Sequence, residues 1–248
     1  MSAVVSGNTT GKATAIVLGR AGSTGVPGKN TRELAGKPCA AWTIEHAQRS
    51  ERIGRVVVST DCPRLADIAR SMSAEVVLRP SDLASDTATV DSAARHAVAG
   101  ADIDGLLALL YANVPVRPEG LIDRAVRVLL ETGCDSVQSY ERVGKHHPWW
   151  IARVDEATGT VRPWEGGVLN HGVYRRQDLP PAYLPDGGVI TLTREALMLE
   201  IDGAGDGPHA FFGNDRRGVV SEPGSVIDID TEADLHRAEA ALASRRVA

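Results

Sequence analysis

Aromatic side chains are scarce in this sequence: Phe, Trp and Tyr make up only 4% of its 248 residues. Because 43% of the residues are nevertheless hydrophobic, the core is expected to consist of Val, Leu, Ile and Ala, as is typical of parallel sheets buried on both faces. The length suits one large α/β domain, or one domain with a smaller insertion.

Cysteine is rare and dispersed. Cys39, Cys62 and Cys134 form no CxxC pair and leave one odd thiol, so neither a disulfide framework nor a zinc site is indicated. This usage fits the reducing cytoplasm, where we expect the protein to work. The segment MSAVVSGNTTGK lacks the charged and then apolar pattern of a signal peptide, and we expect residues 1–12 to form a disordered lead-in.

Positive charge and long apolar runs are also missing. The net charge is −5 and no dense basic run occurs, whereas a dedicated nucleic-acid binder would normally carry a positive stripe. No apolar run is long enough to span a bilayer. We therefore expect neither nucleic acid nor a membrane among the partners.

The first half of the chain alternates apolar β-branched runs with helical patterns. We expect strands at residues 13–18, 55–60, 75–78 and 105–112. We expect helices at residues 39–50, 63–72, 87–99 and 119–131, the third capped by the Asp86/Thr87 pair. This order predicts an α/β fold with a doubly wound, mostly parallel sheet.

The pattern changes after Gly133. Residues 135–176 contain most of the tryptophans, the pair His146-His147 and short extended runs that resemble hairpins, so we interpret them as a small inserted subdomain. Core strands return in LPDGGVITLT and SVIDID, and a last helix is expected over Thr231–Arg246 with Thr231 as its N-cap. Residues 13–134 and 177–248 are thus predicted to form the main domain.

The stretch LGRAGSTGVPGKN, residues 18–30, follows the first expected strand. A Gly-rich loop between a strand and a helix exposes backbone N–H groups at the carboxyl edge of a sheet, where α/β proteins bind anions. The spacing is neither that of a Walker A loop nor GxGxxG. A mobile turn is the alternative, but Arg20 and Lys29 flank the glycines and favour phosphate binding.

Two aspartates stand near the C-terminus in VIDIDTEAD. In a strand, alternate side chains share a face, so Ile227 and Ile229 are expected to enter the core while Asp228 and Asp230 point together the other way. Such a carboxylate pair suits Mg²⁺, which prefers oxygen ligands. The alternative is that Asp228 is a solvated strand residue and Asp230 caps the last helix.

Four stretches occur in a characteristic order: AIVLGRAGSTGVPGKN, VVVSTD, LRPSDLASDTAT and VIDIDTEADLHRAEAAL. Together they closely resemble the acylneuraminate cytidylyltransferase (CMP-sialic acid synthetase) family, including its legionaminic and pseudaminic acid relatives, from about Thr14 to Leu242. The resemblance implies a Rossmann-like fold of the nucleotide-diphospho-sugar transferase type. It further implies that CTP is coupled to a nonulosonic sugar acid with release of pyrophosphate, and that the insertion serves homodimerisation.

The resemblance also implies a set of site residues. CTP would be bound by Leu18, Arg20, Gly22, Ser23, Lys29, Asn30, Arg79, Ser85, Asp86 and Ala88. The acceptor, a small anionic molecule, would be bound by Tyr111, Arg176 and Asp186. Catalysis would rest on Arg20, Lys29, Asp228 and Asp230, the last two carrying Mg²⁺.

The chain departs from the family pattern at several positions. Thr24 stands where the family commonly has Lys in the loop. Tyr111 replaces a glutamine and Val114 a serine, while Asp186 replaces an asparagine and Ile190 a tyrosine. The last four changes fall at the sugar pocket, so we infer a conserved reaction class with an altered acceptor. A phosphonate acceptor, a metal-dependent nucleotide-sugar glycosyltransferase and a non-catalytic nucleotide-binding module are the alternatives.

Other conspicuous residues have ordinary interpretations. The His146-His147 pair is expected in a loop or a dimer contact. Trp149, Trp150 and Trp164 are expected to pack the insertion or a partner subunit. Asp61, at the end of VSTD, is expected either near the nucleotide or as a helix N-cap ahead of Pro63.

Overall fold

A computed structural model describes residues 11–22 and 25–245 of the chain, and its centre is a seven-stranded sheet of order β11-β7-β10-β6-β1-β4-β5. The strands are β1 Ala13–Leu18, β4 Ile53–Thr60, β5 Glu75–Leu78, β6 Leu106–Tyr111, β7 Ser136–Arg142, β10 Tyr183–Thr193 and β11 Arg216–Ser221. Only β10 runs antiparallel to its neighbours, β6 and β7. The mostly parallel, Rossmann-like α/β sheet predicted from the sequence is confirmed.

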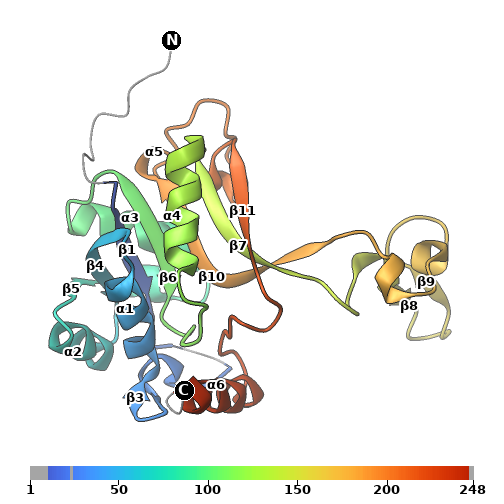
Figure 1. The fold of residues 1–248 in the computed structure, drawn as a ribbon, viewed down its shortest axis with the longest axis horizontal. Helices are drawn as coiled ribbons and strands as arrows, with labels where there is room; N and C mark the ends of the chain where they lie inside the picture. The colour runs from blue at the N-terminus through green and yellow to red at the C-terminus, as the bar shows by residue number, and fades with distance from the viewer. Residues whose placement is uncertain (1–10, 23–24, 246–248) are drawn as a thin grey trace.

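Helices cover both faces of the sheet (Figure 1). They are α1 Cys39–Arg49, α2 Pro63–Ser71, α3 Val90–Gly100, α4 Leu121–Thr132, α5 Arg194–Leu197 and α6 Glu232–Arg245. Ala15 and Val17 of β1 pack in one core cluster with α1, α2 and α4, whereas Ile16 and Leu18 pack in another with α3 and α5. Side chains of alternate strand residues point to opposite faces, so β1 is apolar throughout because both faces are covered.

Short elements connect this framework. The 3₁₀ helices are η1 Lys29–Thr31, η2 Ser81–Ala84, η3 Pro148–Trp150, η4 Leu169–Gly172, η5 Arg176–Asp178 and η6 Ala210–Phe212. Two small antiparallel pairs are β2 Glu33–Leu34 with β3 Lys37–Pro38, and β8 Ala152–Val154 with β9 Val161–Pro163. In the described part of the chain, no helix combines the length and the apolar character needed to cross a bilayer.

The expected start of the third helix is wrong. Helix α3 begins at Val90, and its cap is Thr89, whose side chain accepts a hydrogen bond from the Ser92 N–H at 3.3 Å. Asp86 lies three positions before this cap, and its carboxylate pairs with the Arg20 guanidinium at 2.6 Å. The residues between β5 and α3 form η2 and a loop instead of extra helical turns.

The expected strand over SVIDID is also wrong. The segment has only an isolated antiparallel bridge between Ile227 and Val116 and does not join the central sheet. Its backbone is nevertheless held straight, because Ile227 N–H donates to the Val116 carbonyl and Ile229 N–H to the Asn113 carbonyl. The predicted alternation of buried and outward-facing side chains is therefore present: Ile227 and Ile229 are buried, while Asp228 and Asp230 are not.

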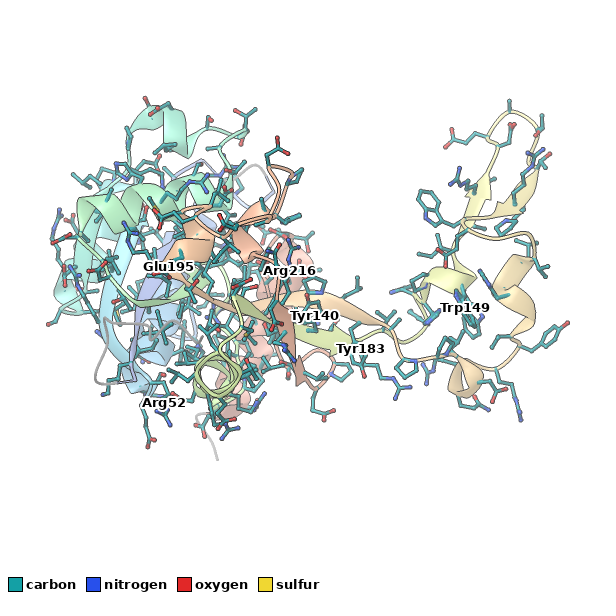
Figure 2. The ribbon with its side chains drawn as sticks, turned by 90° about the horizontal axis from the view of Figure 1, so that it is seen from above. Arg52, Tyr140, Trp149, Tyr183, Glu195 and Arg216 are labelled. Atoms are coloured by element: carbon teal, nitrogen blue, oxygen red, sulfur yellow. The ribbon has the colours of Figure 1, made fainter. Side chains whose placement is uncertain are left out.

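An arm, residues 143–182, leaves the sheet between β7 and β10 and carries the β8–β9 hairpin away from the main body (Figure 1). Figure 2 shows Trp149 in this arm, well separated from Tyr140 of β7. Residues 136–142, which the sequence analysis placed in the insertion, form β7 and pair with both β10 and β11. The excursion therefore begins after Arg142; its independence as a subdomain stays a prediction.

The histidine and tryptophan side chains of the arm pack against one another. His147 is buried and accepts from the Trp149 N–H through Nδ1 at 3.2 Å. The Trp149 ring stacks on His171 with centroids 4.6 Å apart. The stacking on His171 confirms that Trp149 packs within the insertion.

Candidate active site

The glycine loop and the acidic segment meet at one edge of the molecule. Gly25 packs so closely on Asp230 that an added Cβ would lie 2.3 Å from the Asp230 carbonyl oxygen. Lys29 Nζ donates to the Ile229 carbonyl at 2.7 Å and to Asp230 Oδ1 at 2.7 Å. Two segments about 200 positions apart therefore form one surface.

The loop lies where the topology of the sheet requires. Strand β1 is paired in parallel with β4 and β6, so its carboxyl end is at the centre of the binding edge of the sheet. At Gly19 an added Cβ would lie 2.5 Å from Leu65 Cδ2 and 2.9 Å from Ala112 Cβ. Only glycine lets the chain turn between these two neighbours.

Two polar side chains fix the start of the loop. Asp61 Oδ1 accepts a hydrogen bond from the Ala21 N–H at 2.8 Å, and Asn30 Nδ2 donates to the Arg20 carbonyl at 2.9 Å. The N-cap of α2 is Cys62, without a side-chain cap. Asp61 therefore lies beside the glycine loop and does not cap α2.

The two aspartates have different surroundings. Burial raises the pKa of Asp228 to about 6, the negative charge of Asp230 adds to this, and Lys29 and Arg117 oppose it. Asn113 Nδ2 donates to Asp228 Oδ1 and, at 3.2 Å, to the Ile229 carbonyl. Asp228 is thus an oriented carboxylate, whereas Asp230 is exposed and held by Lys29.

Asp230 is not the cap of the last helix. Asp234 N–H donates to Thr231 Oγ1 at 3.3 Å, and Thr231 N–H donates back to Asp234 Oδ2 at 3.0 Å. This reciprocal pair is a capping box in which an aspartate takes the usual glutamate position. Thr231 is confirmed as the N-cap, and Asp230 keeps its carboxylate for other uses.

The carboxylate pair fits a hard cation that shares its shell with a substrate. Within residues 11–22 and 25–245, no cluster of three or more His, Cys, Asp or Glu side chains could hold a metal ion. Mg²⁺ commonly takes only one or two protein carboxylates and completes its shell with water and phosphate oxygens. Asp228 and Asp230 would supply the two carboxylates of such a site, and water and phosphate oxygens would supply the other ligands.

Several predicted CTP residues gather beside the loop. Arg79 Nη2 donates to the Ser59 carbonyl at 2.9 Å, and burial lowers its pKa. Arg20 pairs with Asp86 and donates to the Ala84 carbonyl at 3.4 Å. The structure thus brings Arg20, Arg79 and the segment that contains Ser85, Asp86 and Ala88 to one side of the sheet edge.

The other predicted CTP residues lie in β1 and the loop that follows it. Leu18 ends β1, and a Cβ at Gly22 would meet nothing within 4 Å. Ser23 and Thr24 lie outside the described residues.

A cavity of about 650 Å³ adjoins Asp228. Its walls include Tyr111, Asp186 and Asp228, and burial raises the pKa of the Tyr111 hydroxyl. Arg176, the third predicted acceptor residue, lies exposed in η5 of the arm and is not brought to this cavity within the chain. The predicted acceptor set is therefore only partly assembled in one protomer.

Sequence reasoning missed a second cavity of about 420 Å³ that shares Tyr111, Gln138 and Pro185 with the first. Its floor includes Phe211 and Phe212, whose rings stack with centroids 4.4 Å apart. The adjacent phenylalanines were a possible signal, because the sequence contains no others.

Arg117 was also missed. Its side chain is almost wholly buried, at 1% exposure. It donates to the carbonyls of Gly188 at 2.6 Å and Tyr111 at 3.1 Å, to Thr43 Oγ1 at 2.9 Å and to the Val114 carbonyl. Burial lowers its pKa to about 10. Arg117 ties the loop that carries Asn113 to helix α1, through Thr43, and to β10, through Gly188.

The chain matches a family model described as cytidylyltransferase over residues 14–148. It is 38% identical over 227 residues to a CMP-N,N'-diacetyllegionaminic acid synthase of Legionella pneumophila, which covers 89% of this chain and 91% of that protein. It is 28% identical over 224 residues to an N-acylneuraminate cytidylyltransferase of Streptococcus agalactiae serotype V, covering 89% of this chain and 51% of that protein. The chain thus spans about half the length of the first curated relatives it matches.

Among solved structures, a CMP:2-keto-3-deoxy-manno-octonic acid synthetase complexed with CTP superposes with a TM-score of 0.70 at 16% identity, covering 94% of this chain and 99% of that one. A 4-diphosphocytidyl-2C-methyl-D-erythritol synthase from Anaerococcus prevotii superposes with a TM-score of 0.61 at 13% identity, with the same coverage. At these identities the likeness concerns the fold.

Proposed function

This chain belongs to the cytidylyltransferase family, and from that premise we propose that it couples CTP to a nonulosonic, sialic-acid-like sugar acid and releases pyrophosphate. The observation that carries the proposal is the contact of the glycine loop and Lys29 with Asp230, beside Asp228 and the 650 Å³ cavity. This arrangement offers a place for a triphosphate, a cation and an acceptor within one continuous surface.

In the proposed reaction, a hydroxyl of the acceptor attacks the α-phosphorus of CTP while the bond to pyrophosphate breaks. The protein's task in such transfers is mostly positioning and charge neutralisation. Lys29 and Arg20 are the cations at the loop and are proposed to neutralise the leaving pyrophosphate. Arg79, fixed by the carbonyl of Ser59, is proposed to orient the nucleoside.

We propose that Asp228 and Asp230 hold Mg²⁺. Bound there, the ion would supply positive charge to the phosphate oxygens and lower the pKa of an attacking hydroxyl. Asn113 orients Asp228 for this role. Lys29 offsets part of the negative charge of Asp230, with which it pairs.

The test is a pyrophosphate-release assay with CTP, Mg²⁺ and a panel of acceptors that includes N-acylneuraminic, legionaminic and pseudaminic acids and a phosphonate. Release that depends on a sugar acid supports the proposal. Release only with the phosphonate would move the chain to a different acceptor. Hydrolysis of a nucleotide sugar would favour a glycosyltransferase, and CTP binding without turnover a non-catalytic module.

The arm supports a proposed homodimer. It exposes large side chains, among them Tyr174 at 91% and Val168 at 63% exposure, and such patches commonly mark interaction sites. In a dimer, Arg176 of the arm could serve a cavity that it does not reach in its own protomer. Sedimentation analysis of the chain with and without residues 146–177 tests this.

We also propose that the reaction takes place in the cytoplasm. All three cysteines are free thiols, and burial raises the pKa of Cys39 to about 12. Unpaired thiols are usual in a reducing compartment. Fractionation of cells that express the chain tests this placement.

A further inference from the structure

Arg20, one of the two cations of the glycine loop, pairs with a carboxylate from another segment of the chain. Its Nη1 atom lies 2.6 Å from Asp86 Oδ1 and donates to the Ala84 carbonyl at 3.4 Å. The Arg20 side chain is 31% exposed and the Asp86 side chain 69% exposed. A phosphate group that binds Arg20 therefore has to compete with Asp86 for the same guanidinium.

The glycine loop fixes the position of Arg20. Asn30 Nδ2 donates to the Arg20 carbonyl at 2.9 Å, and the next residue is held by the hydrogen bond from the Ala21 N–H to Asp61. Burial lowers the pKa of Arg79, Asp61 opposes this, and the nearby charge of Arg20 lowers it further. Two cations thus share this part of the sheet edge, where an anion offsets their repulsion.

The segment that carries Asp86 is held less firmly. The residues of η2 are all at least partly exposed. The hydrogen bonds of Ser85 are local, because its Oγ donates to the Asp82 carbonyl at 3.0 Å and lies 3.2 Å from Thr87 Oγ1. Exposed segments with local hydrogen bonds open at low free-energy cost, and ion pairs between partly exposed side chains are weak. Asp86 can therefore leave Arg20 without disturbing the core.

We propose that Asp86 competes with phosphate groups for Arg20: phosphate oxygens displace its carboxylate when CTP binds, and the carboxylate returns to Arg20 as pyrophosphate leaves. The inference rests on the proposed function, in which Arg20 neutralises the leaving pyrophosphate. Phosphate groups carry more charge than one carboxylate and form strong bidentate pairs with a guanidinium, so they win the competition when present. The competition weakens the binding of pyrophosphate and thereby favours its release.

Pyrophosphate is the probe that isolates this competition. It has no base and no ribose, so a contact of Asp86 with the nucleoside cannot change its affinity. Asp86→Asn keeps the size of the side chain and removes the charge that pairs with Arg20. Any gain in pyrophosphate affinity in this variant therefore comes from the charge of Asp86.

The test is a calorimetric titration of the full chain with pyrophosphate, at one fixed Mg²⁺ concentration, for wild type and Asp86→Asn. Pyrophosphate should bind the variant about fivefold more tightly, because the competing ion pair of exposed groups is lost. In turnover assays, pyrophosphate should inhibit the variant at a correspondingly lower concentration. Asp86→Glu, which restores the carboxylate, should bind pyrophosphate within about twofold of wild type.

Asp82→Asn is the matched control, because Asp82 is an exposed carboxylate of the same segment. Its pyrophosphate affinity should stay within about twofold of wild type, since separated exposed charges are screened by salt. Unchanged or weaker binding of pyrophosphate to Asp86→Asn overturns the inference. An equal gain in Asp82→Asn also overturns it, because the effect would then come from net charge.

Failure of the proposed function gives a different result. A wild-type chain that binds neither CTP nor pyrophosphate removes the proposed function, and the inference with it. A wild-type chain that binds both and turns CTP over, with no gain in Asp86→Asn, leaves the proposed function intact and removes the inference alone.

Discussion

Lys29 Nζ lies 2.7 Å from Oδ1 of Asp230, across 201 positions of sequence. The lysine side chain is only 16% exposed, whereas the aspartate side chain is 71% exposed. An ion pair with one solvated partner contributes little to stability. The ion pair instead fixes the position of the Lys29 ammonium group between the glycine loop and the acidic segment.

Replacing Lys29 by glutamine should therefore impair catalysis more than folding. Loss of one charge contact to the leaving group commonly costs about 3 kcal/mol, or roughly a hundredfold in rate. Steady-state pyrophosphate release measures kcat and the KM for CTP. Lys37→Gln is the matched control, because Lys37 also pairs with a carboxylate, Glu45, but outside the site. Equal activity of Lys29→Gln and Lys37→Gln would contradict the assignment.

Asp228→Asn and Asp230→Asn should each reduce turnover by about a hundredfold at saturating CTP. Both remove a carboxylate from the proposed Mg²⁺ site, so the Mg²⁺ concentration for half-maximal rate should also rise. A Mg²⁺ titration of the rate measures both effects. Asp104→Asn, at a carboxylate that is 90% exposed, controls for the change in net charge. Normal turnover in both variants at saturating Mg²⁺ would exclude this metal site.

The stability of the metal-free protein should depend on Asp228 in a pH-dependent way. Its pKa is raised from 3.8 to about 6, so its contribution to stability is fully present below about pH 4 and is lost as the pH rises through 6. Asp228→Asn removes this dependence and should stabilise the protein above pH 6 by up to about 3 kcal/mol, with no gain near pH 4. Urea unfolding at several pH values, without Mg²⁺, measures the difference.

Asp234 should contribute to stability with the opposite pH dependence. A hydrogen bond from the Thr231 side chain, then the backbone N–H groups of Thr231 and Asp230, lowers its pKa. Its contribution is present at neutral pH and is lost as the pH falls through its folded pKa. Asp234→Asn should thus destabilise at neutral pH and approach wild type in acid. If the effects of Asp228→Asn and Asp234→Asn on stability changed with pH in the same direction, the pKa direction assigned to one of these groups would be wrong.

Arg117→Met should destabilise the fold strongly. The guanidinium donates to three carbonyls and to Thr43 Oγ1 in a buried place. Methionine removes all of these hydrogen bonds, although the Tyr111 and Val114 carbonyls still accept from the Thr43 hydroxyl. The expected loss is about 3 kcal/mol or more in the free energy of unfolding. Arg55→Met, which breaks a partly exposed pair with Glu75, should cost about 1 kcal/mol or less. Similar losses of unfolding free energy in the two variants would mean that Arg117 does not link the Asn113 loop to α1 and β10 as inferred.

The sheet was predictable because its signals are local. Residues 13–18 and 75–78 are strands with the boundaries expected from their apolar runs. Both runs are bounded by residues that break them. Strand β1 is buried on both faces, whereas β5, at the edge of the sheet, is only partly buried and was recognisable from its apolar Val-Val-Leu run. The family resemblance likewise depended on short ordered motifs and is confirmed by the relatives.

The site was only partly predictable because its remaining signals are long-range. Nothing near Asp228 in sequence indicates Asn113, which orients it across 115 positions. Strand β7 was misassigned because its pairing with β10 and β11, and not its own pattern, places it in the sheet. The cap of α3 was misread because Asp86, Thr87 and Thr89 are all residues that can cap a helix, and the structure uses Thr89.

Gly25→Ala tests whether the loop must pack against the acidic segment. The added Cβ would lie 2.3 Å from the Asp230 carbonyl oxygen and 3.4 Å from its carbonyl carbon, and backbone atoms cannot turn away as a flexible side chain can. Either the loop or residue 230 must shift, which typically costs about 1–3 kcal/mol. Because a displacement of about 1 Å can cost roughly a hundredfold in rate, kcat/KM for CTP should fall well beyond what the loss of stability explains.

Gly207→Ala is the matched control. An added Cβ at this position meets nothing within 4 Å, so the variant should retain wild-type kinetics. A Gly25→Ala protein with wild-type kcat/KM would show that the loop and the carboxylates work independently, and the proposed shared binding surface for CTP and Mg²⁺ would then have to be abandoned.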